Sequence, residues 1–288
     1  MRDMEKLNIQ WYPGHMTKTR RQIESDLRQV DAVCEIVDAR IPLASRNPDI
    51  DSLCAGKPRL LVLNRADLAD PAATKAWASW FQRQGLTVLV TDCKSRKGIA
   101  SFAPAARTAC AEKLRRDRER GMNRPLRVMV VGIPNVGKST LINQVSGRKG
   151  AKAENRPGVT RGKQWVTVDE SLQLLDTPGI LWPKFEDPQV GLLLAFTGAV
   201  KENVLDVEEL ACRLAERLAR YYPQTLRERY RVEPEGAGWE ILERAGRNRG
   251  FLMSGGEVNL ERMCRVLLEE YRAGKLGNIT LEMPEETQ

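Results

Sequence analysis

The stretch LRVMVVGIPNVGKST, residues 126–140, decides the fold of this chain. Its first six residues are apolar apart from Arg127, which predicts a buried strand. The next eight, GIPNVGKS, match the pattern GxxxxGKS between a strand and a helix, the context that this motif requires. Glycines let the backbone approach phosphates, and successive N–H groups at a helix N-terminus form an anion site. The stretch therefore predicts a loop that binds the phosphates of a nucleotide.

Two side chains of this loop have expected roles in chemistry. Lys138 is predicted to bridge the β- and γ-phosphates, and the Ser139 hydroxyl is predicted to bind Mg²⁺. The full set of nucleotide contacts expected from the loop is Asn135, Val136, Gly137, Lys138, Ser139 and Thr140.

Two segments downstream complete a phosphate-sensing site. Asp176 ends the predicted strand LQLLD, residues 172–176, and opens the motif DTPG. We expect Asp176 to hold the Mg²⁺ shell and the N–H of Gly179 to sense the γ-phosphate. Between these segments the loop RPGVTR supplies Thr160, the candidate that completes Mg²⁺ coordination in the triphosphate state. The predicted metal set is therefore Ser139, Thr160 and Asp176.

Base recognition is expected to precede the phosphate loop in the chain. The motif NRAD, residues 64–67, follows the apolar run RLLVLN, and the Asp67 carboxylate can accept from both N1–H and N2–H₂ of guanine. After the next predicted strand, Asp92 and Cys93 stand where a further loop would contact the guanine O6. The predicted base contacts are Asn64, Arg65, Ala66, Asp67, Asp92 and Cys93. This order indicates a circular permutation, with the basic segment 113–125 joining the natural termini.

The wider pattern predicts an α/β domain followed by a smaller all-helical one. Three apolar runs, residues 33–38, 59–64 and 86–91, alternate with helical segments, which favours βαβ units and a mostly parallel sheet. One of those helices, residues 71–85, carries Trp77, Trp80 and Phe81 at helical spacing, expected in the core. Beyond about Pro188 strand signals fade, and residues 202–222 and 257–277 are helix-periodic. The predicted domains are residues 1–188 and 189–288.

Composition limits the class of protein and its partners. Residues 1–189 hold 32 basic against 21 acidic side chains, whereas the remainder holds 14 against 17. A basic excess of this size favours a polyanionic partner such as RNA. The six cysteines are scattered without a C-x-x-C pair, which argues against zinc and disulfides and fits reduced thiols. Apolar runs are too short to span a bilayer, so we expect no membrane association and a cytoplasmic location.

The motif order, GIPNVGKS, DTPG and the opening WYPGHM, residues 11–16, resemble the circularly permuted ribosome biogenesis GTPase A family. The resemblance covers about residues 9 to 198. It implies a P-loop GTPase that binds GTP, GDP and Mg²⁺ and assists late maturation of the large ribosomal subunit, with the C-terminal domain helping to dock on rRNA. Two departures stand out. Arg65 replaces the usual lysine that lies along guanine, and Asp92-Cys93-Lys94 is an unusual last base-contacting loop.

Hydrolysis is expected to be slow without a partner. Ile180 occupies the position where Ras-like GTPases carry a water-orienting glutamine. The chain's single histidine, His15, is the candidate that positions the water, a role that the resemblance also gives it; alternatively it caps the following helix. The predicted catalytic residues are His15, Lys138 and Thr160. Asn135 is a candidate to hold K⁺ beside the β- and γ-phosphates.

Control by nucleotide is expected from the chain order, because Asp176 leads within about a dozen residues into the helical tail. The sequence thus predicts a GTP-hydrolysing assembly factor of the large ribosomal subunit, stimulated by that partner, contacting its rRNA and monomeric when free. Three alternatives remain. These are an RNA-binding protein that uses GTP as a structural ligand, a GTPase with a non-ribosomal partner, and a P-loop ATPase or kinase.

Overall fold

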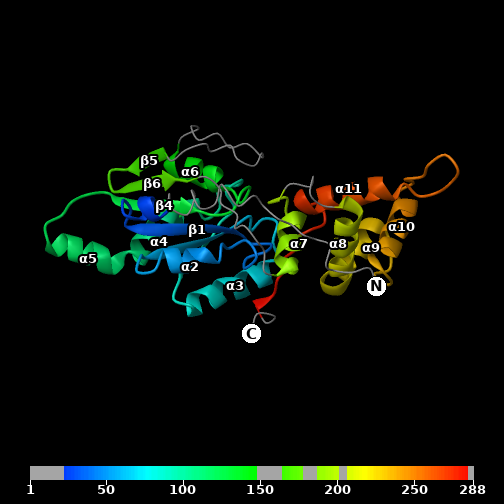
Figure 1. The fold of residues 1–288 in the computed structure, drawn as a ribbon, viewed down its shortest axis with the longest axis horizontal. Helices are drawn as coiled ribbons and strands as arrows, with labels where there is room; N and C mark the ends of the chain where they lie inside the picture. The colour runs from blue at the N-terminus through cyan, green and yellow to red at the C-terminus, as the bar shows by residue number, and fades with distance from the viewer. Residues whose placement is uncertain (1–22, 148–163, 178–186, 201–205, 285–288) are drawn as a thin grey trace. The chain divides into compact units, whose positions relative to one another are not determined.

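The computed structural model describes residues 23–147, 164–177, 187–200 and 206–284 (Figure 1). These residues divide into two compact units. Of the described residues, those up to 177 together with 282–284 form the sheet unit, and those from 187 to 281 form the helical unit. The chain therefore returns to the sheet unit at its C-terminal end.

The sheet unit is built on a six-stranded sheet in the order β3-β2-β1-β4-β6-β5. Its strands are β1 (Ala32–Asp38), β2 (Arg59–Asn64), β3 (Thr87–Val90), β4 (Leu126–Val131), β5 (Gln164–Asp169) and β6 (Leu172–Asp176). All neighbouring pairs are parallel except β5 and β6, which pair antiparallel. The predicted fold class, α/β with a mostly parallel sheet, is confirmed.

Helices connect these strands as the alternating pattern predicts. They are α2 (Asp49–Leu53), α3 (Pro71–Arg83), α4 (Phe102–Ala109), α5 (Ala111–Glu119) and α6 (Lys138–Ser146), with a short 3₁₀ turn η2 (Ile99–Ser101). Helix α3 begins where the sequence indicates, because Asp70 accepts from the N–H groups of Ala72 and Ala73 and Pro71 occupies the first turn. Helix α5 overlaps the first part of the basic segment expected to join the natural termini.

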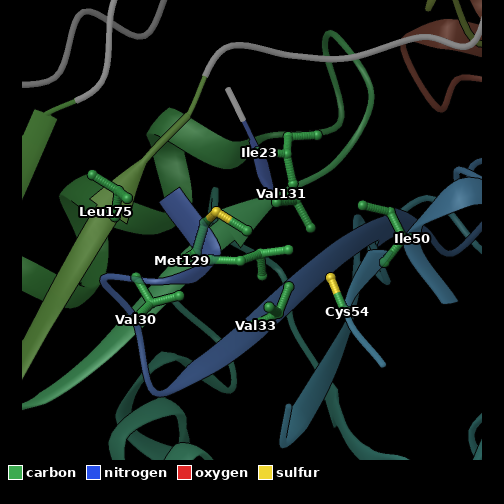
Figure 2. Packing of buried hydrophobic residues seen from close by; sticks show 9 residues of the cluster. Ile23, Val30, Val33, Ile50, Cys54, Met129, Val131 and Leu175 are labelled. Atoms are coloured by element: carbon green, nitrogen blue, oxygen red, sulfur yellow. The ribbon is translucent and has the colours of Figure 1, made fainter. Parts of the chain in front are cut away.

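Two apolar clusters hold the sheet unit together. Figure 2 shows one in which Val33 of β1 packs with Met129 and Val131 of β4, joined by Ile50 of α2 and Leu175 of β6. Burying an aliphatic side chain of this size contributes about 1.5–3 kcal/mol. This cluster fixes β1, β4 and β6, whose carboxyl ends carry the predicted loops.

The second cluster contains the aromatic side chains expected in the core. Trp77 and Phe81 of α3 are fully buried and stack with ring centroids 5.5 Å apart, and Trp80 packs edge-on against both. The indole N–H of Trp77 donates to the carbonyl of Glu282 at 2.8 Å. The Glu282 carboxylate in turn accepts from the N–H groups of Leu43 and Ala44, at 2.8 and 3.0 Å. These bonds anchor the C-terminal segment on the sheet unit.

The described part of the helical unit contains five helices that pack together. These are α7 (Pro188–Phe196), α8 (Val207–Tyr221), α9 (Pro223–Tyr230), α10 (Gly238–Asn248) and α11 (Leu260–Arg272). Helices α8 and α11 fall within the two segments predicted as helical. The buried Glu270 carboxylate of α11 links this helix to α9 and to the end of α10, because it accepts from Arg229, Arg249 and the Tyr230 hydroxyl. Among the described residues, no helix combines the length and apolar character needed to cross a membrane.

Candidate nucleotide-binding site

The phosphate loop connects β4 to α6 and depends on two glycines. Gly132 has φ of 155°, and a Cβ there would collide with the carbonyl of Ile36 on β1. Gly137 has φ of 104° at the N-terminus of α6, and a Cβ there would collide with the Asn64 side chain. Both positions therefore require glycine, the first because strands pack closely there and the second because a neighbouring loop does.

Lys138 is buried inside this loop. Its ammonium donates to the carbonyls of Gly132 and Ile133, at 2.9 and 2.8 Å. Within the described part of the chain, two of its three protons therefore have carbonyl acceptors, and the third remains for a ligand such as a phosphate oxygen. Burial lowers the pKa of Lys138 to about 8, although the charge of Asp176 opposes this shift. A phosphate bound here would add the negative charge that the buried ammonium needs.

Asp176 lies at the carboxyl end of β6, beside the phosphate loop. It is buried, and its Oδ1 has no hydrogen-bond donor among the described residues. Burial raises the pKa of Asp176, opposed by the Lys138 charge and by a backbone hydrogen bond from Thr177. A buried carboxylate oxygen without a donor fits a cation or its bound water, because such a group is costly to leave unpaired. The residues present therefore fit Mg²⁺, with Asp176 and the half-buried Ser139 as oxygen ligands.

Asn64 joins the base-recognition loop to the phosphate loop. Its amide donates to the carbonyl of Val136 at 2.8 Å. Its Oδ1 accepts from the Thr91 hydroxyl at 3.1 Å and from the N–H of Cys93 at 3.2 Å. One buried amide thus connects three loops that are far apart in sequence. This arrangement supports the permuted order, because base and phosphate loops meet at the carboxyl edge of one sheet.

Arg65 and Asp67 follow Asn64 in the same loop. Arg65 adopts φ of 61° and donates through Nη2 to the carbonyl of Asn135 in the phosphate loop. Asp67 is exposed at the surface, where guanine can reach its carboxylate. Burial and the nearby Asp92 carboxylate raise the pKa of Asp67. Ala66 contributes its backbone, because its N–H donates to the carbonyl of Thr91 at 3.1 Å.

The loop after β3 uses its side chains to hold its own shape. The Asp92 carboxylate accepts from the N–H of Lys94 at 2.8 Å. Burial acts to raise the pKa of Asp92, but hydrogen bonds from Ser95 and Lys94 outweigh it and lower the pKa. Cys93 is buried, and burial raises the pKa of its thiol to about 12. Cys93 therefore takes part through its N–H to Asn64, while its thiol is unreactive.

The remaining predicted positions divide into two groups. Ser139 and Thr140 are half-buried in the first turn of α6, next to Lys138. His15, Thr160 and Gly179 lie outside the described residues. The structure also brings a pair to this edge that the sequence analysis did not single out: Asp38 at the end of β1 and Arg40, with Nη2 and Oδ2 2.7 Å apart. The signal available for Asp38 was its place at the end of an apolar strand.

Comparisons with known proteins agree with this geometry. A family model described as 50S ribosome-binding GTPase matches residues 127–228. Ribosome biogenesis GTPase A of Bacillus cereus is 46% identical, covering 96% of this chain and 95% of that protein. A GDP-bound structure of YlqF matches with TM-score 0.68 and 29% identity over 92% of this chain and 100% of that one. A GNP-bound YlqF structure from T. maritima matches with TM-score 0.67 and 29% identity, covering 93% and 99%.

The similarity to the Bacillus protein extends over nearly the full length of both chains, so it spans both units. The phosphate loop with its buried Lys138 is the phosphate-binding part expected of a P-loop GTPase, and Asn64 holds the loop that begins at residue 64 against it. The chain therefore belongs to the ribosome biogenesis GTPase A family and is a GTPase with a role in ribosome assembly.

Proposed function

We propose that this GTPase acts on the large ribosomal subunit as it is assembled, and that its GTP state controls binding to and release from the subunit. The observation that carries the proposal is the match of residues 127–228 to a family described as 50S ribosome-binding GTPase. The matched range includes the phosphate loop, Asp176 and the first helices of the helical unit. The matched range therefore contains both the segment proposed to sense the nucleotide and the helices that follow it.

Lys138 and the surrounding backbone account for phosphate binding. The third proton of the Lys138 ammonium is available to bridge the β- and γ-phosphate oxygens, and the N-terminus of α6 adds its dipole. Because these groups are held before GTP arrives, they stabilise charge that develops on the phosphates without reorganising. Mg²⁺ would be held by Ser139, Asp176 and Thr160, and when bound it supplies positive charge to the phosphate oxygens.

Asn64, Arg65 and Asp67 account for base binding. Asn64 sets the distance between base and phosphate loops, and Asp67 accepts from both guanine N–H groups. Asp92 and Cys93 contribute through the shape and backbone of the loop next to the guanine O6. Asn135, in a left-handed conformation with φ of 62°, is proposed to hold K⁺ beside the phosphates. Equal turnover rates in potassium and sodium buffers would rule out that ion.

Coupling between nucleotide state and subunit binding is proposed to pass through Asp176. Thr177, the next residue, is fixed to the sheet because its hydroxyl donates to the carbonyl of Val130 at 2.7 Å. Ten residues further on, Asp187 caps α7, the first helix of the helical unit. Ordering of the intervening chain by the γ-phosphate would therefore act on a segment continuous with that unit. Identical hydrogen exchange of residues 190–288 with GDP and a GTP analogue would contradict this.

Contact with rRNA is proposed for the sheet unit, because residues 1–189 carry the basic excess of the chain. All six cysteines are free thiols, which supports work in a reducing compartment such as the cytoplasm. The free protein is proposed to be a monomer.

The test is GTP turnover with purified large subunits, purified small subunits or neither, at low and physiological salt. We expect strong stimulation by large subunits alone, with the Lys138→Ala variant as the control for contaminating hydrolase. Equal stimulation by both subunits would refute the assignment to the large one. Co-sedimentation with a GTP analogue and with GDP tests control by nucleotide, and equal binding in both states would refute that part.

A further inference from the structure

A buried ion pair lies directly beside the base loop. Arg40 is fully buried and Asp38 nearly so. The Arg40 guanidinium binds the Asp38 carboxylate through two bonds, Nε to Oδ1 at 2.9 Å and Nη2 to Oδ2 at 2.7 Å, and the N–H of Arg40 adds a third at 3.0 Å. Burial alone would raise the pKa of Asp38, but the charge and hydrogen bonds of Arg40, together with the charge of Arg65, lower it. The carboxylate is therefore ionised at neutral pH.

Such a pair needs an explanation beyond fold stability. Taking two charges out of water costs several kcal/mol per ion, so a buried salt bridge contributes little net stability, and apolar residues of similar volume often replace it without loss. The pair also sits at a defined place. Asp38 is in register with Asn64 across β1 and β2, and the N–H of Ala39 donates to the Asn64 carbonyl at 2.8 Å. The end of β1 is thereby fixed to the base loop.

The Asp38 carboxylate faces the Arg65 side chain. Arg65 Nε lies 3.8 Å from Asp38 Oδ2, the oxygen that Arg40 Nη2 also contacts. At the other side of the same guanidinium, Nη2 donates to the carbonyl of Asn135 in the phosphate loop. Arg65 and Asn135 both have left-handed backbones, with φ of 61° and 62°. A residue other than glycine adopts this conformation at a cost in free energy, so its surroundings must hold it in place.

We propose that Asp38, oriented by Arg40, is a positioning residue for guanine nucleotide binding that acts by fixing Arg65 between the base loop and the phosphate loop. This inference rests on the proposed assignment of residues 64–67 to guanine recognition. It also accounts for arginine at this position. The two anchors use different nitrogens of one planar fork, Nε for the carboxylate and Nη2 for the carbonyl, whereas a lysine has a single nitrogen. Affinity for the nucleotide thus depends on a residue that does not touch it.

The proposal is tested by replacing both buried charges with neutral amides, which gives the charge-neutral variant. Asp38→Asn alone leaves Arg40 buried and uncompensated, which is a strongly destabilising change. The double variant Asp38→Asn/Arg40→Gln removes both charges and keeps polar groups that can bond to each other. Its GDP affinity, measured by titration, is expected to fall about fivefold or more. The KM for GTP should rise and kcat should stay, because Arg65 contacts the base equally in the ground and transition states.

Coupling distinguishes positioning from general loosening of the domain. Arg65→Lys is expected to weaken GDP binding to a similar degree. The triple variant combines Arg65→Lys with the two charge-neutral substitutions. Its GDP affinity should be about the same as that of Arg65→Lys or of the charge-neutral variant alone, because both changes remove the same contact. Additive losses of GDP affinity in the triple variant, or wild-type GDP affinity in the charge-neutral variant, would overturn the proposal.

Glu35→Gln is the matched control. Glu35 is also a buried carboxylate on β1 held by two arginines, Arg46 and Arg59, but those contacts lead away from the nucleotide loops. We expect its thermal stability to fall while its GDP affinity stays within about twofold of wild type. If Glu35→Gln lost as much GDP affinity as the charge-neutral variant, that result would count against a specific role for Asp38. If the wild-type protein binds GDP no better than ADP, the base-loop assignment fails and the inference with it; guanine-selective binding with additive losses overturns the inference alone.

Discussion

The side-chain amide of Asn64 donates to the carbonyl of Val136 at 2.8 Å, although 72 positions separate the two residues in the chain. This bond connects the loop expected to bind the base with the loop expected to bind the phosphates. In a permuted chain these loops are joined covalently through α3, β3 and the helices that follow. The distance between base and phosphate sites therefore depends on non-covalent contacts, among which those of Asn64 are central.

Asn64→Ala is expected to weaken GDP binding and destabilise the sheet unit together. The change removes a hydrogen-bond partner from the Thr91 hydroxyl, the Cys93 N–H and the Val136 carbonyl. Losing the partner of a buried polar group costs about 1–3 kcal/mol of folding stability. Nucleotide titration and thermal unfolding measure the two effects. Asn47→Ala is the control, because the side chain of this buried asparagine accepts from the N–H of Asp49, outside the nucleotide loops. It should lower stability and spare affinity.

Lys138 predicts a pH dependence of stability in the nucleotide-free protein. Its pKa is about 8 in the folded protein and 10.5 for an ordinary lysine. Between these pH values the unfolded chain binds a proton that the folded protein does not, so the free energy of unfolding rises with pH there. Relative to Lys138→Met, the wild type should gain on the order of 1–3 kcal/mol from pH 8 to 10.5. Denaturant unfolding at several pH values measures the difference, and a constant difference would contradict the burial argument.

The sheet unit could be predicted closely because its signals are local. Each predicted strand ends within a residue or two of its observed end, and each loop expected to carry chemistry follows a parallel strand. Asp70 and Pro71 mark the start of α3, and the helical spacing of Trp77 and Phe81 indicates its buried face. Periodicity and capping need no knowledge of distant partners, so one sequence suffices for them.

What could not be predicted depends on contacts between distant residues. Glu282 binds the backbone of Leu43 and Ala44 across more than 230 positions, and no local pattern signals a carboxylate in that role. The position of Cys93 predicts a base contact, but it does not show that the thiol is buried or that the Cys93 N–H binds Asn64. Asp38 cannot be singled out from sequence because its contacts are with Arg40 and Arg65, whose side-chain directions only the fold determines.

His15→Ala is expected to lower the turnover rate stimulated by large subunits about a hundredfold, the contribution of a residue that positions or deprotonates water. Binding to the subunit should be unchanged, which co-sedimentation measures. His15→Gln provides the comparison, because a glutamine amide can orient water and should recover part of the rate. If His15→Ala keeps the full stimulated rate, the histidine has a structural role, such as capping the helix that follows it.

Asp67→Asn is expected to change the base that the enzyme prefers. The Asp67 carboxylate can accept from both N1–H and N2–H₂ of guanine, whereas an asparagine amide offers one acceptor and one donor group. That pattern matches xanthine, which carries a carbonyl in place of the guanine amino group. GDP affinity should therefore fall on the order of a hundredfold and affinity for xanthosine diphosphate should rise. Titration of both nucleotides against wild type and variant measures the exchange. The phosphate contacts of Lys138 are common to both nucleotides, so a variant that loses affinity for both has a damaged loop, and one that retains its preference for GDP shows that another residue reads the base.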